Sequence, residues 1–169
     1  MNITLSKMEF DHAVAISHWK YPSPYEIYSM DGSEDTIHEL LGEHYYLALN
    51  EQNELVGYLC FGDGARVPGG YKAGIYEDHS TLDIGLGLHP DLTGQGYGTT
   101  LVQEGIRFSE NYAPTTLQLV VASFNERAIS VYEKAGFVPM KQFYSPVDGK
   151  NVEFLQMKLD IKNAGLNKE

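Results

Sequence analysis

The chain has 169 residues; its hydrophobic fraction of 43% and its 12 tyrosines suit one globular domain and exclude global disorder. A formal net charge of −11, from 12 Lys and Arg against 23 Asp and Glu, disfavours nucleic acid and anionic membranes as partners and favours cationic ones. One cysteine, Cys60, excludes an internal disulfide. No apolar stretch has the length of a membrane helix, so we expect a soluble, cytoplasmic protein with one domain over residues 1–160 and a polar tail over 161–169.

The first half of the chain alternates short periodic segments with loops rich in glycine and proline. In chain order it predicts a strand near Ile3–Met8, a short helix from Asp11 to Trp19, an irregular aromatic loop over Lys20–Met30, a short helix over Asp35–Glu43, two hairpin strands at Tyr45–Leu49 and Leu55–Phe61, and a flexible excursion over Gly62–Gly74. Asp11 and Asp35 are the candidate caps of the two helices.

The second half has longer and more regular segments. In chain order it predicts a strand over Thr81–Leu88, a helix over Gly96–Tyr112, a strand over Leu117–Ala122, a helix over Asn125–Ala135 that ends at Gly136, and strands over Phe137–Tyr144 and Asn151–Leu159. Ser123 and Asn125 are rival caps of the second helix. Strands first, then strand–helix–strand–helix–strands, argue for an α+β fold.

The turn after Leu88 carries the clearest chemical signal, because glycines alternate at positions 94, 96 and 98 just before a helix begins. Glycine leaves room for a ligand to approach the backbone and tolerates dihedrals that aim several N–H groups at one point. The helix start adds unpaired N–H donors and the positive end of its dipole. The turn therefore predicts a pyrophosphate site built from main-chain amides.

Two other phosphate-binding turns do not match. A P-loop needs Gly-Lys-Ser/Thr, and no lysine lies in this turn. A dinucleotide-binding turn needs glycines at its first, third and sixth positions, but counted from Gly94 the sixth position is Thr99. Such a turn also needs an acidic residue about 20 positions further on, and none lies near Thr116.

Two blocks together resemble the GNAT acetyltransferase superfamily. Thr93–Gly98 (TGQGYG) is similar to the family signature Arg/Gln-x-x-Gly-x-Gly/Ala and follows a His-Pro turn, here His89-Pro90. Residues 125–137 (NERAISVYEKAGF) are similar to the family element Asn-x-x-Ala-x-x-x-Tyr-x-x-x-Gly-Phe. The resemblance implies a mixed, mostly antiparallel twisted sheet of about seven strands, with strands four and five splayed apart, flanked by about four helices.

The resemblance also implies how the acetyl donor, acetyl-CoA, would lie. Its pantetheine arm would fit between the splayed strands, and the glycine turn would hold its pyrophosphate through N–H groups. Asn125 would hydrogen-bond the cofactor, and Tyr132 would sit near its sulfur. The cofactor-binding residues implied in this way are Leu86, Gly87, Leu88, Thr93, Gly94, Gln95, Gly96, Tyr97, Gly98, Thr99, Asn125 and Tyr132.

One position departs from the family pattern, because Thr93 stands where Arg or Gln is usual. A charge-assisted phosphate contact is thereby replaced by a hydroxyl contact or lost. Arg127 or Lys134 could contact the nucleotide phosphates instead. No metal is expected, since the His-Glu segment that begins at His38 lacks the second histidine of a zinc motif.

The implied reaction is direct transfer of acetyl from the thioester to an amine in a ternary complex. Asp83 is the candidate base, because along an extended strand its carboxylate shares a face with Gly85 and Gly87 and so faces a gap that a substrate could fill. The backbone N–H of Leu88 is the candidate oxyanion donor, and Tyr132 the candidate proton donor to the thiolate. A structural role for Asp83 is an equal alternative.

The acceptor site is expected in the aromatic loop and in the excursion after it. Trp19, Tyr21, Tyr25 and Tyr28 are candidates for an aromatic wall around a cationic amine, with Glu26 and Asp63 as candidates for meeting its ammonium. The same aromatic side chains could equally pack the loop onto the sheet. Pairing of such domains is common in the family, so a homodimer is a further expectation.

Two alternatives to an enzyme stay open at this point. A non-catalytic acyl-CoA sensor or interaction module on the same fold is favoured by Thr93 and by the absence of a strand-five base, since Val120 stands where a related subgroup carries glutamate. More remotely, a nucleotide-binding protein of another fold could use the glycine turn alone.

Overall fold

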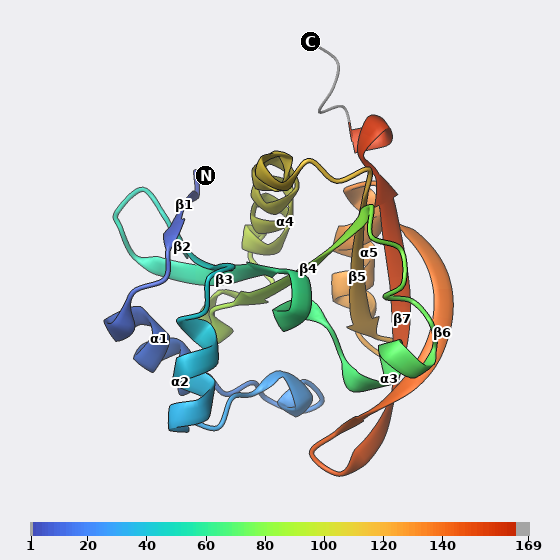
Figure 1. The fold of residues 1–169 in the computed structure, drawn as a ribbon. Helices are drawn as coiled ribbons and strands as arrows, with labels where there is room; N and C mark the ends of the chain where they lie inside the picture. Colours follow the sequence, from blue (N-terminus) through green and yellow to red (C-terminus); the bar gives the residue numbers. More distant parts are fainter. Residues whose placement is uncertain (1, 165–169) are drawn as a thin grey trace.

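The computed structural model describes residues 2–164, which form a single seven-stranded sheet with helices on both faces (Figure 1). The strand order is β1-β2-β3-β4-β5-β7-β6, and every neighbouring pair is antiparallel except β4 and β5. The strands are β1 (Thr4–Lys7), β2 (Tyr45–Leu49), β3 (Leu55–Phe61), β4 (Thr81–Leu88), β5 (Thr116–Ala122), β6 (Val138–Val147) and β7 (Lys150–Asp160). The predicted α+β class and mostly antiparallel sheet are confirmed.

Two longer helices, α4 (Tyr97–Phe108) and α5 (Glu126–Lys134), cover one face of the sheet. The opposite face carries α1 (Phe10–Ser17), α2 (Glu34–Leu40) and the short α3 (Pro68–Lys72). Alternation along each strand sends one set of side chains to each face, so β4 gives Ile84 to the first core and its glycines to the other. None of the helices within residues 2–164 is long and apolar enough to cross a membrane.

Helix starts differ from the sequence predictions by a residue or two. Ser33, and not Asp35, caps α2 by accepting a hydrogen bond from the Thr36 N–H at 3.1 Å, while α1 follows Glu9 without a side-chain cap, so Asp11 is not a cap. Asn125 caps α5 by accepting from the Ala128 N–H at 3.1 Å. A cap must immediately precede the first helical residue, and this position depends on where the chain leaves the preceding loop.

The excursion after β3 is more ordered than its glycine content indicates. It forms the 3-10 turn η2 (Gly62–Ala65) and α3, which begins at Pro68 because proline is pre-organised for the first helical position. The other 3-10 turns are η1 (Glu26–Tyr28), η3 (Pro90–Leu92), η4 (Ser109–Tyr112) and η5 (Ile161–Ala164). Part of the predicted tail, residues 165–169, lies outside the described residues.

The feature that positions the site is the divergence of β4 from β5. The two strands pair only from Thr81↔Thr116 to Asp83↔Gln118. Beyond that point β4 continues as the partner of β3 up to Leu88, and β5 continues as the partner of β7 up to Ala122. The predicted splay of strands four and five is therefore present, and we call the opening between them the fork.

Candidate active site at the fork

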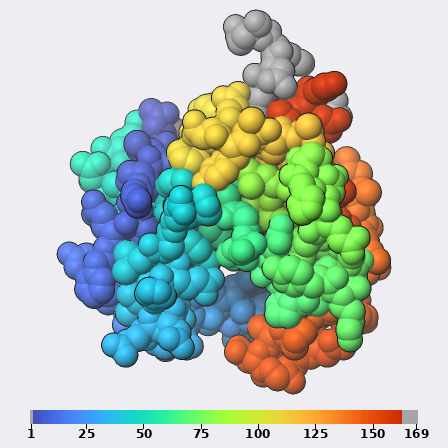
Figure 2. All heavy atoms as spheres, viewed as in Figure 1, coloured from blue at the N-terminus to red at the C-terminus, as the bar shows by residue number. Residues whose placement is uncertain are grey.

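A cavity of about 730 Å³ passes through the fork from one face of the sheet to the other. Its lining includes Leu86 and Tyr132 from the face covered by α4 and α5, and Tyr58 and Val120 from the opposite face. Figure 2 shows the molecule hollowed between α2, the segment after β3 and the hairpin that joins β6 to β7. We call the two ends of this cavity the α4/α5 side and the α2 side.

The edge of β4 presents to the fork peptide groups that have no strand partner. The His89 N–H donates to the Val56 carbonyl at 2.8 Å, which fixes the alternation of the antiparallel β3–β4 ladder. By that alternation the N–H and C=O of Leu86 and Leu88 point away from β3, into the space that β5 has left. The Leu88 carbonyl accepts from the Tyr21 hydroxyl, so an extended, amide-containing chain could pair with the Leu86 N–H, the Leu86 carbonyl and the Leu88 N–H.

The glycine turn lies where the cavity meets the start of α4. Gly94 and Gly96 have φ values of +77° and +90°, a region that residues with a side chain rarely adopt. Apart from the adjacent backbone, a Cβ placed on Gly96 or Gly98 would meet no atom of residues 2–164 within 4 Å, so the space in front of this turn is open. Main-chain N–H groups at a helix start, with open space beside them, are the features from which anion sites are built.

Arg127 places a cation beside that turn. One guanidinium nitrogen lies 3.8 Å from the position of a Cβ on Gly94, and the guanidinium carbon lies 4.8 Å from the centre of the Tyr25 ring. Arg127 lines the cavity, whereas Lys134 does not. Thr93 donates its hydroxyl hydrogen bond to the Pro90 carbonyl at 3.3 Å. Arg127 is thus the cation best placed to compensate for threonine at position 93.

Helix α5 brings Tyr132 to the cavity, and its cap residue Asn125 reaches the same cavity. The Asn125 side chain is engaged on both sides, because its oxygen caps α5 and its amide donates to the Tyr28 hydroxyl at 3.3 Å. Burial, and to a smaller degree Tyr28, raises the pKa of Tyr132 well above the ordinary value for tyrosine. Its hydroxyl therefore keeps its proton at neutral pH and can donate it.

The aromatic loop spans the fork and contacts the ends of both β4 and β5. The Tyr21 hydroxyl donates to the Leu88 carbonyl at the end of β4, at 2.5 Å. The Tyr28 hydroxyl accepts from the Ala122 N–H at the end of β5, at 3.2 Å. Tyr21, Tyr25 and Tyr28 line the cavity, and so does Glu26. The loop thereby forms part of the cavity wall while holding the two strand ends.

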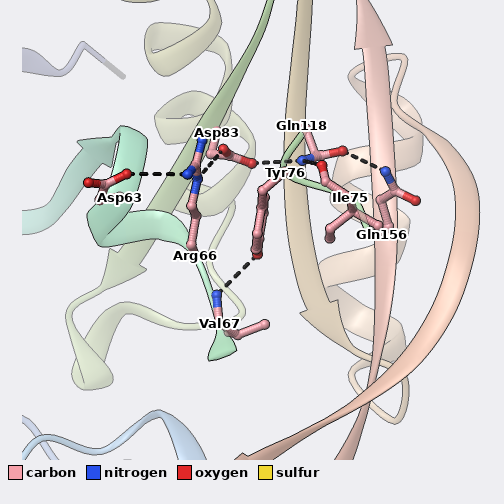
Figure 3. Close-up of polar contacts among 8 residues, drawn as sticks. All are labelled: Asp63, Arg66, Val67, Ile75, Tyr76, Asp83, Gln118 and Gln156. Carbon is pink, nitrogen blue, oxygen red and sulfur yellow. Dashed lines mark hydrogen bonds and ion pairs between the residues drawn. The ribbon is translucent and has the colours of Figure 1, made fainter. Parts of the chain in front are cut away.

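Asp83 belongs to a buried polar network at the closed end of the fork (Figure 3). Its side chain is 3% exposed and accepts from Arg66 Nε and Gln118 Nε2, each at 2.8 Å. Gln156 donates to Gln118 at 2.5 Å, which extends the network across β4, β5 and β7. Burial raises the pKa of Asp83, while the hydrogen bonds from Gln118 and Arg66 oppose that rise. Through these contacts Asp83 fixes the position of Arg66 and links β4 to β5 at the last pair of residues before the two strands diverge.

The gap expected beside Gly85 and Gly87 is filled by the protein itself. A Cβ on Gly87 would collide with the ring of Tyr58, and one on Gly85 would lie 2.9 Å from the Cys60 sulfur. The expectation that a substrate fills this gap is therefore wrong, because glycines at these positions admit side chains from β3. Asp83 itself does not line the cavity, and its assignment as the base stays a prediction.

Three further residues at the α2 side were missed by sequence reasoning. Tyr58 lies across β4, Tyr45 stacks on it with ring centres 6.3 Å apart, and Glu39 accepts a hydrogen bond from the Tyr45 hydroxyl at 2.6 Å. All three line the cavity. Strand alternation would have put Tyr58 and Cys60 on one face of the hairpin. Nothing in the sequence brings Glu39 to that face.

Most of the predicted site residues meet at the cavity. Those that line it are Tyr21, Tyr25, Glu26, Tyr28, Leu86, Gly87, Leu88, Thr93, Gly94, Gly96, Gly98, Thr99, Asn125 and Tyr132. Trp19, Asp63, Gln95 and Tyr97 do not. Trp19 is buried against His89 with ring centres 5.1 Å apart, and the Gln95 amide donates to the Asp91 carbonyl at 2.9 Å.

Comparison with curated proteins finds a short, specific segment of likeness. Over 53 residues the chain is 42% identical to mycothiol acetyltransferase from Streptomyces coelicolor, which covers 31% of this chain and 17% of that protein. The chain thus matches only a small part of the length of this relative.

Solved structures match over nearly the whole chain, at low sequence identity. An acetyltransferase of the GNAT family from Bacillus anthracis has a TM-score of 0.74 at 17% identity, with 96% of each chain covered. Spermidine/spermine N-acetyltransferase SpeG from Vibrio cholerae has a TM-score of 0.70 at 16% identity and covers 99% of this chain and 100% of its own. YncA from Salmonella typhimurium, solved with its cofactor acetyl-CoA, has a TM-score of 0.63 at 19% identity, with 94% of each chain covered.

The family comparison draws these observations together. The model of the Acetyltransferase (GNAT) family matches residues 13–137, which include both strands of the fork, the glycine turn and α5. The predicted resemblance is confirmed over most of the chain. With its splayed β4 and β5 and its glycine turn at the start of α4, this chain belongs to the GNAT acetyltransferase family.

Proposed function

We propose that the protein is an N-acetyltransferase that moves acetyl from acetyl-CoA directly to an amine while both substrates are bound. The observation that carries the proposal is the cavity through the fork, which joins a main-chain anion site on one side to a wall of polar and aromatic side chains on the other. Two substrates entering from opposite faces of the sheet could meet in it without a covalent enzyme intermediate.

The α4/α5 side fits acetyl-CoA. The fork-facing peptide groups of Leu86 and Leu88 have no strand partner there and suit the amides of a pantetheine arm. The open space beside Gly96 and Gly98 suits a pyrophosphate, and Arg127 adds a positive charge next to it. When bound, acetyl-CoA supplies the activated thioester carbonyl.

The chain's own groups would then divide the work of the transfer. The Leu88 N–H points into the fork and would donate to the carbonyl oxygen as negative charge develops there. Tyr132, whose hydroxyl is protonated at neutral pH, would donate to the departing sulfur. Asp83 would have an indirect, positioning role, because it holds the Arg66 guanidinium at the cavity wall.

The acceptor is proposed to be a cationic amine, on the basis of charge at the α2 side. Four carboxylates line that end, from Glu26, Asp31, Glu39 and Asp148. Its two cations are already engaged, because Lys20 donates to the Met30 carbonyl and Arg66 pairs with Asp83. The excess of negative charge agrees with the overall charge of −11 and would attract an ammonium.

Two measurements test the proposal. Titration calorimetry should detect binding of acetyl-CoA, with CoA as competitor and ATP and NAD as non-competing controls. Incubation with acetyl-CoA and a panel of amines should release free thiol in step with acetylated amine. Absence of acetyl-CoA binding would overturn the whole proposal, whereas binding with no turnover on a broad panel would overturn only the catalytic part.

A non-catalytic acyl-CoA sensor is the second candidate, and one observation favours it. Both Asp83 oxygens accept hydrogen bonds, so the carboxylate predicted as base has no contact with the cavity. Tight binding of acetyl-CoA without transfer to any amine is the result expected for a sensor. Transfer that is lost in Tyr132→Phe counts against it.

A further inference from the structure

Glu39 and Tyr45 form the one carboxylate–tyrosine pair at the α2 side of the cavity within residues 2–164. Tyr45 begins β2 and is 8% exposed, and its hydroxyl donates to Glu39 Oε2 at 2.6 Å. Glu39 is in the last turn of α2 and is exposed to solvent. The pair therefore joins a buried hydroxyl in the cavity wall to a carboxylate that meets water.

The pair lies one aromatic ring away from the fork-facing edge of β4. The Tyr58 ring occupies the space over Gly87, next to the peptide group of Leu88, and the Tyr45 ring stacks on Tyr58 at an interplanar angle of 28°. All of these residues line the same cavity. The stacked rings of Tyr45 and Tyr58 therefore lie in the wall of the cavity from which we expect an amine to reach Leu88.

The groups that face Tyr45 leave Glu39 as its proton acceptor. From β3, Tyr58 and Cys60 face it, and burial raises the pKa of the Cys60 thiol to about 12, so the thiol stays neutral. From the segment after β3 comes the Gly64 carbonyl, which can only accept a hydrogen bond. Burial, Cys60 and Glu39 raise the pKa of Tyr45, so its hydroxyl gives up a proton only as it receives another.

The other carboxylates at this end are less suited to take a proton from the acceptor. Asp31 accepts from the Ser33 N–H at 2.9 Å and the Thr36 hydroxyl at 2.7 Å, which lowers its pKa to about 2. Glu26 and Asp148 also line the cavity, but both are exposed to solvent. In the part of the chain that the structure describes, neither carboxylate accepts a hydrogen bond from a buried side chain. Asp83 lies outside the lining.

We propose that Tyr45 and Glu39 form a proton relay that deprotonates the acceptor ammonium, a step that rests on the proposed acetyl transfer. At the α2 side, before the nitrogen reaches the thioester beside Leu88, the N–H bond of the ammonium breaks as its proton passes to the Tyr45 oxygen, and the Tyr45 O–H bond breaks as its proton passes to Glu39 Oε2. The nitrogen keeps the electron pair with which it attacks the thioester carbonyl. Neutral Glu39 then releases its proton to solvent, which restores the pair.

The test compares Glu39→Gln and Tyr45→Phe with wild type by kcat/KM between about pH 6 and pH 10, the range in which amine acceptors titrate. Glutamine can still accept the Tyr45 hydrogen bond but cannot take its proton, so this variant keeps the local packing. Glu43→Gln is the matched control, because Glu43 is an exposed carboxylate four residues away that does not line the cavity. Thermal unfolding of each variant checks that it is folded.

Two acceptors separate proton transfer from binding. With an alkylamine, which is protonated at pH 7, we expect kcat/KM at that pH to fall about 100-fold in both variants. The loss should shrink as pH rises toward the pKa of the amine, because the amine then arrives neutral. With an acceptor that is already neutral at pH 7, the loss should stay below about tenfold, while Glu43→Gln matches wild type with both.

Other outcomes overturn the relay. Equal losses for charged and neutral acceptors at every pH, or an effect of Glu39→Gln on KM alone, would make Glu39 a binding residue. Full activity of Tyr45→Phe would remove Tyr45 from the path. In each of these cases wild-type transfer still supports the proposed function, whereas a wild-type protein that transfers no acetyl to any amine overturns both proposals.

Discussion

The two sides of the cavity are built on different principles. The α4/α5 side presents mainly peptide groups, from the free edge of β4 and from the glycine turn, and these come from a compact stretch of chain. The α2 side presents side chains from the aromatic loop, α2, β2, β3 and the β6–β7 hairpin. A site built from main-chain groups can bind the same ligand throughout a family, because it does not depend on particular side chains. A site built from side chains can bind a different acceptor when those side chains are substituted. Each of the following substitutions tests one side against the other.

The largest effect is expected on the α4/α5 side, from Tyr132→Phe. If Tyr132 donates its proton to the departing sulfur, kcat should fall about 100-fold while the affinity for acetyl-CoA measured by calorimetry stays unchanged. Tyr144→Phe is the control, since Tyr144 is 58% exposed and does not line the cavity. Unchanged kcat in Tyr132→Phe would contradict the proposed role.

The next effect concerns the closed end of the fork. Asp83→Ala leaves the partly buried Arg66 without its buried partner and should lower the free energy of unfolding by about 3 kcal/mol, measured from the urea midpoint. Asp63→Asn touches the same guanidinium from a side chain that is 92% exposed and should change stability by less than about 0.5 kcal/mol. A folded Asp83→Asn that has lost all turnover would instead favour Asp83 as the base.

A smaller effect isolates the main-chain anion site. Gly96→Ala puts a Cβ at φ +90°, a strained position at the start of α4, and should weaken acetyl-CoA binding about tenfold as the turn shifts. Gly62→Ala is matched, because Gly62 has φ +82° and equally open space, yet does not line the cavity. It should lose comparable stability and keep its affinity for acetyl-CoA; equal losses of affinity would show that strain alone is responsible.

The smallest effect separates the two residues that the sequence offers as caps of α5. Asn125→Ala removes the cap of α5 and a contact with Tyr28, and should cost about 1 kcal/mol, or about 3 °C in Tm. Ser123→Ala removes a buried hydroxyl that has no hydrogen-bond partner, so its Tm should not fall. The reverse result would restore Ser123 as the cap.

Much of the α4/α5 side could be predicted from sequence, because its signals are local. The strand ending at Leu88, the glycines at 94, 96 and 98 and the α5 segment containing Asn125 and Tyr132 all lie where the two sequence blocks place them. The α2 side could not be predicted in the same way. Its contacts are made between residues far apart in the chain, such as Tyr21 and Leu88, and they depend on how the aromatic loop crosses the fork.

Asp83 is the clearest example of a residue whose surroundings could not be predicted from the sequence. Period-two alternation correctly put Asp83 on one face with Gly85 and Gly87. Only the packed structure reveals that Tyr58 and Cys60 fill the space beside those glycines, and that Arg66 and Gln118 take both carboxylate oxygens. The alternation of one strand predicts which side chains share a face of the sheet. The side chains that pack against that face come from the neighbouring strands.

By itself the sequence determined the family, the α+β class and the glycine turn at the start of α4, because these depend on residues close together in the chain. The tertiary structure decided which side chains meet across the fork: Glu39 on Tyr45, Tyr28 on Ala122, and Asp83 on Arg66. Such contacts depend on strand order and on the path of long loops, which no local pattern of residues encodes.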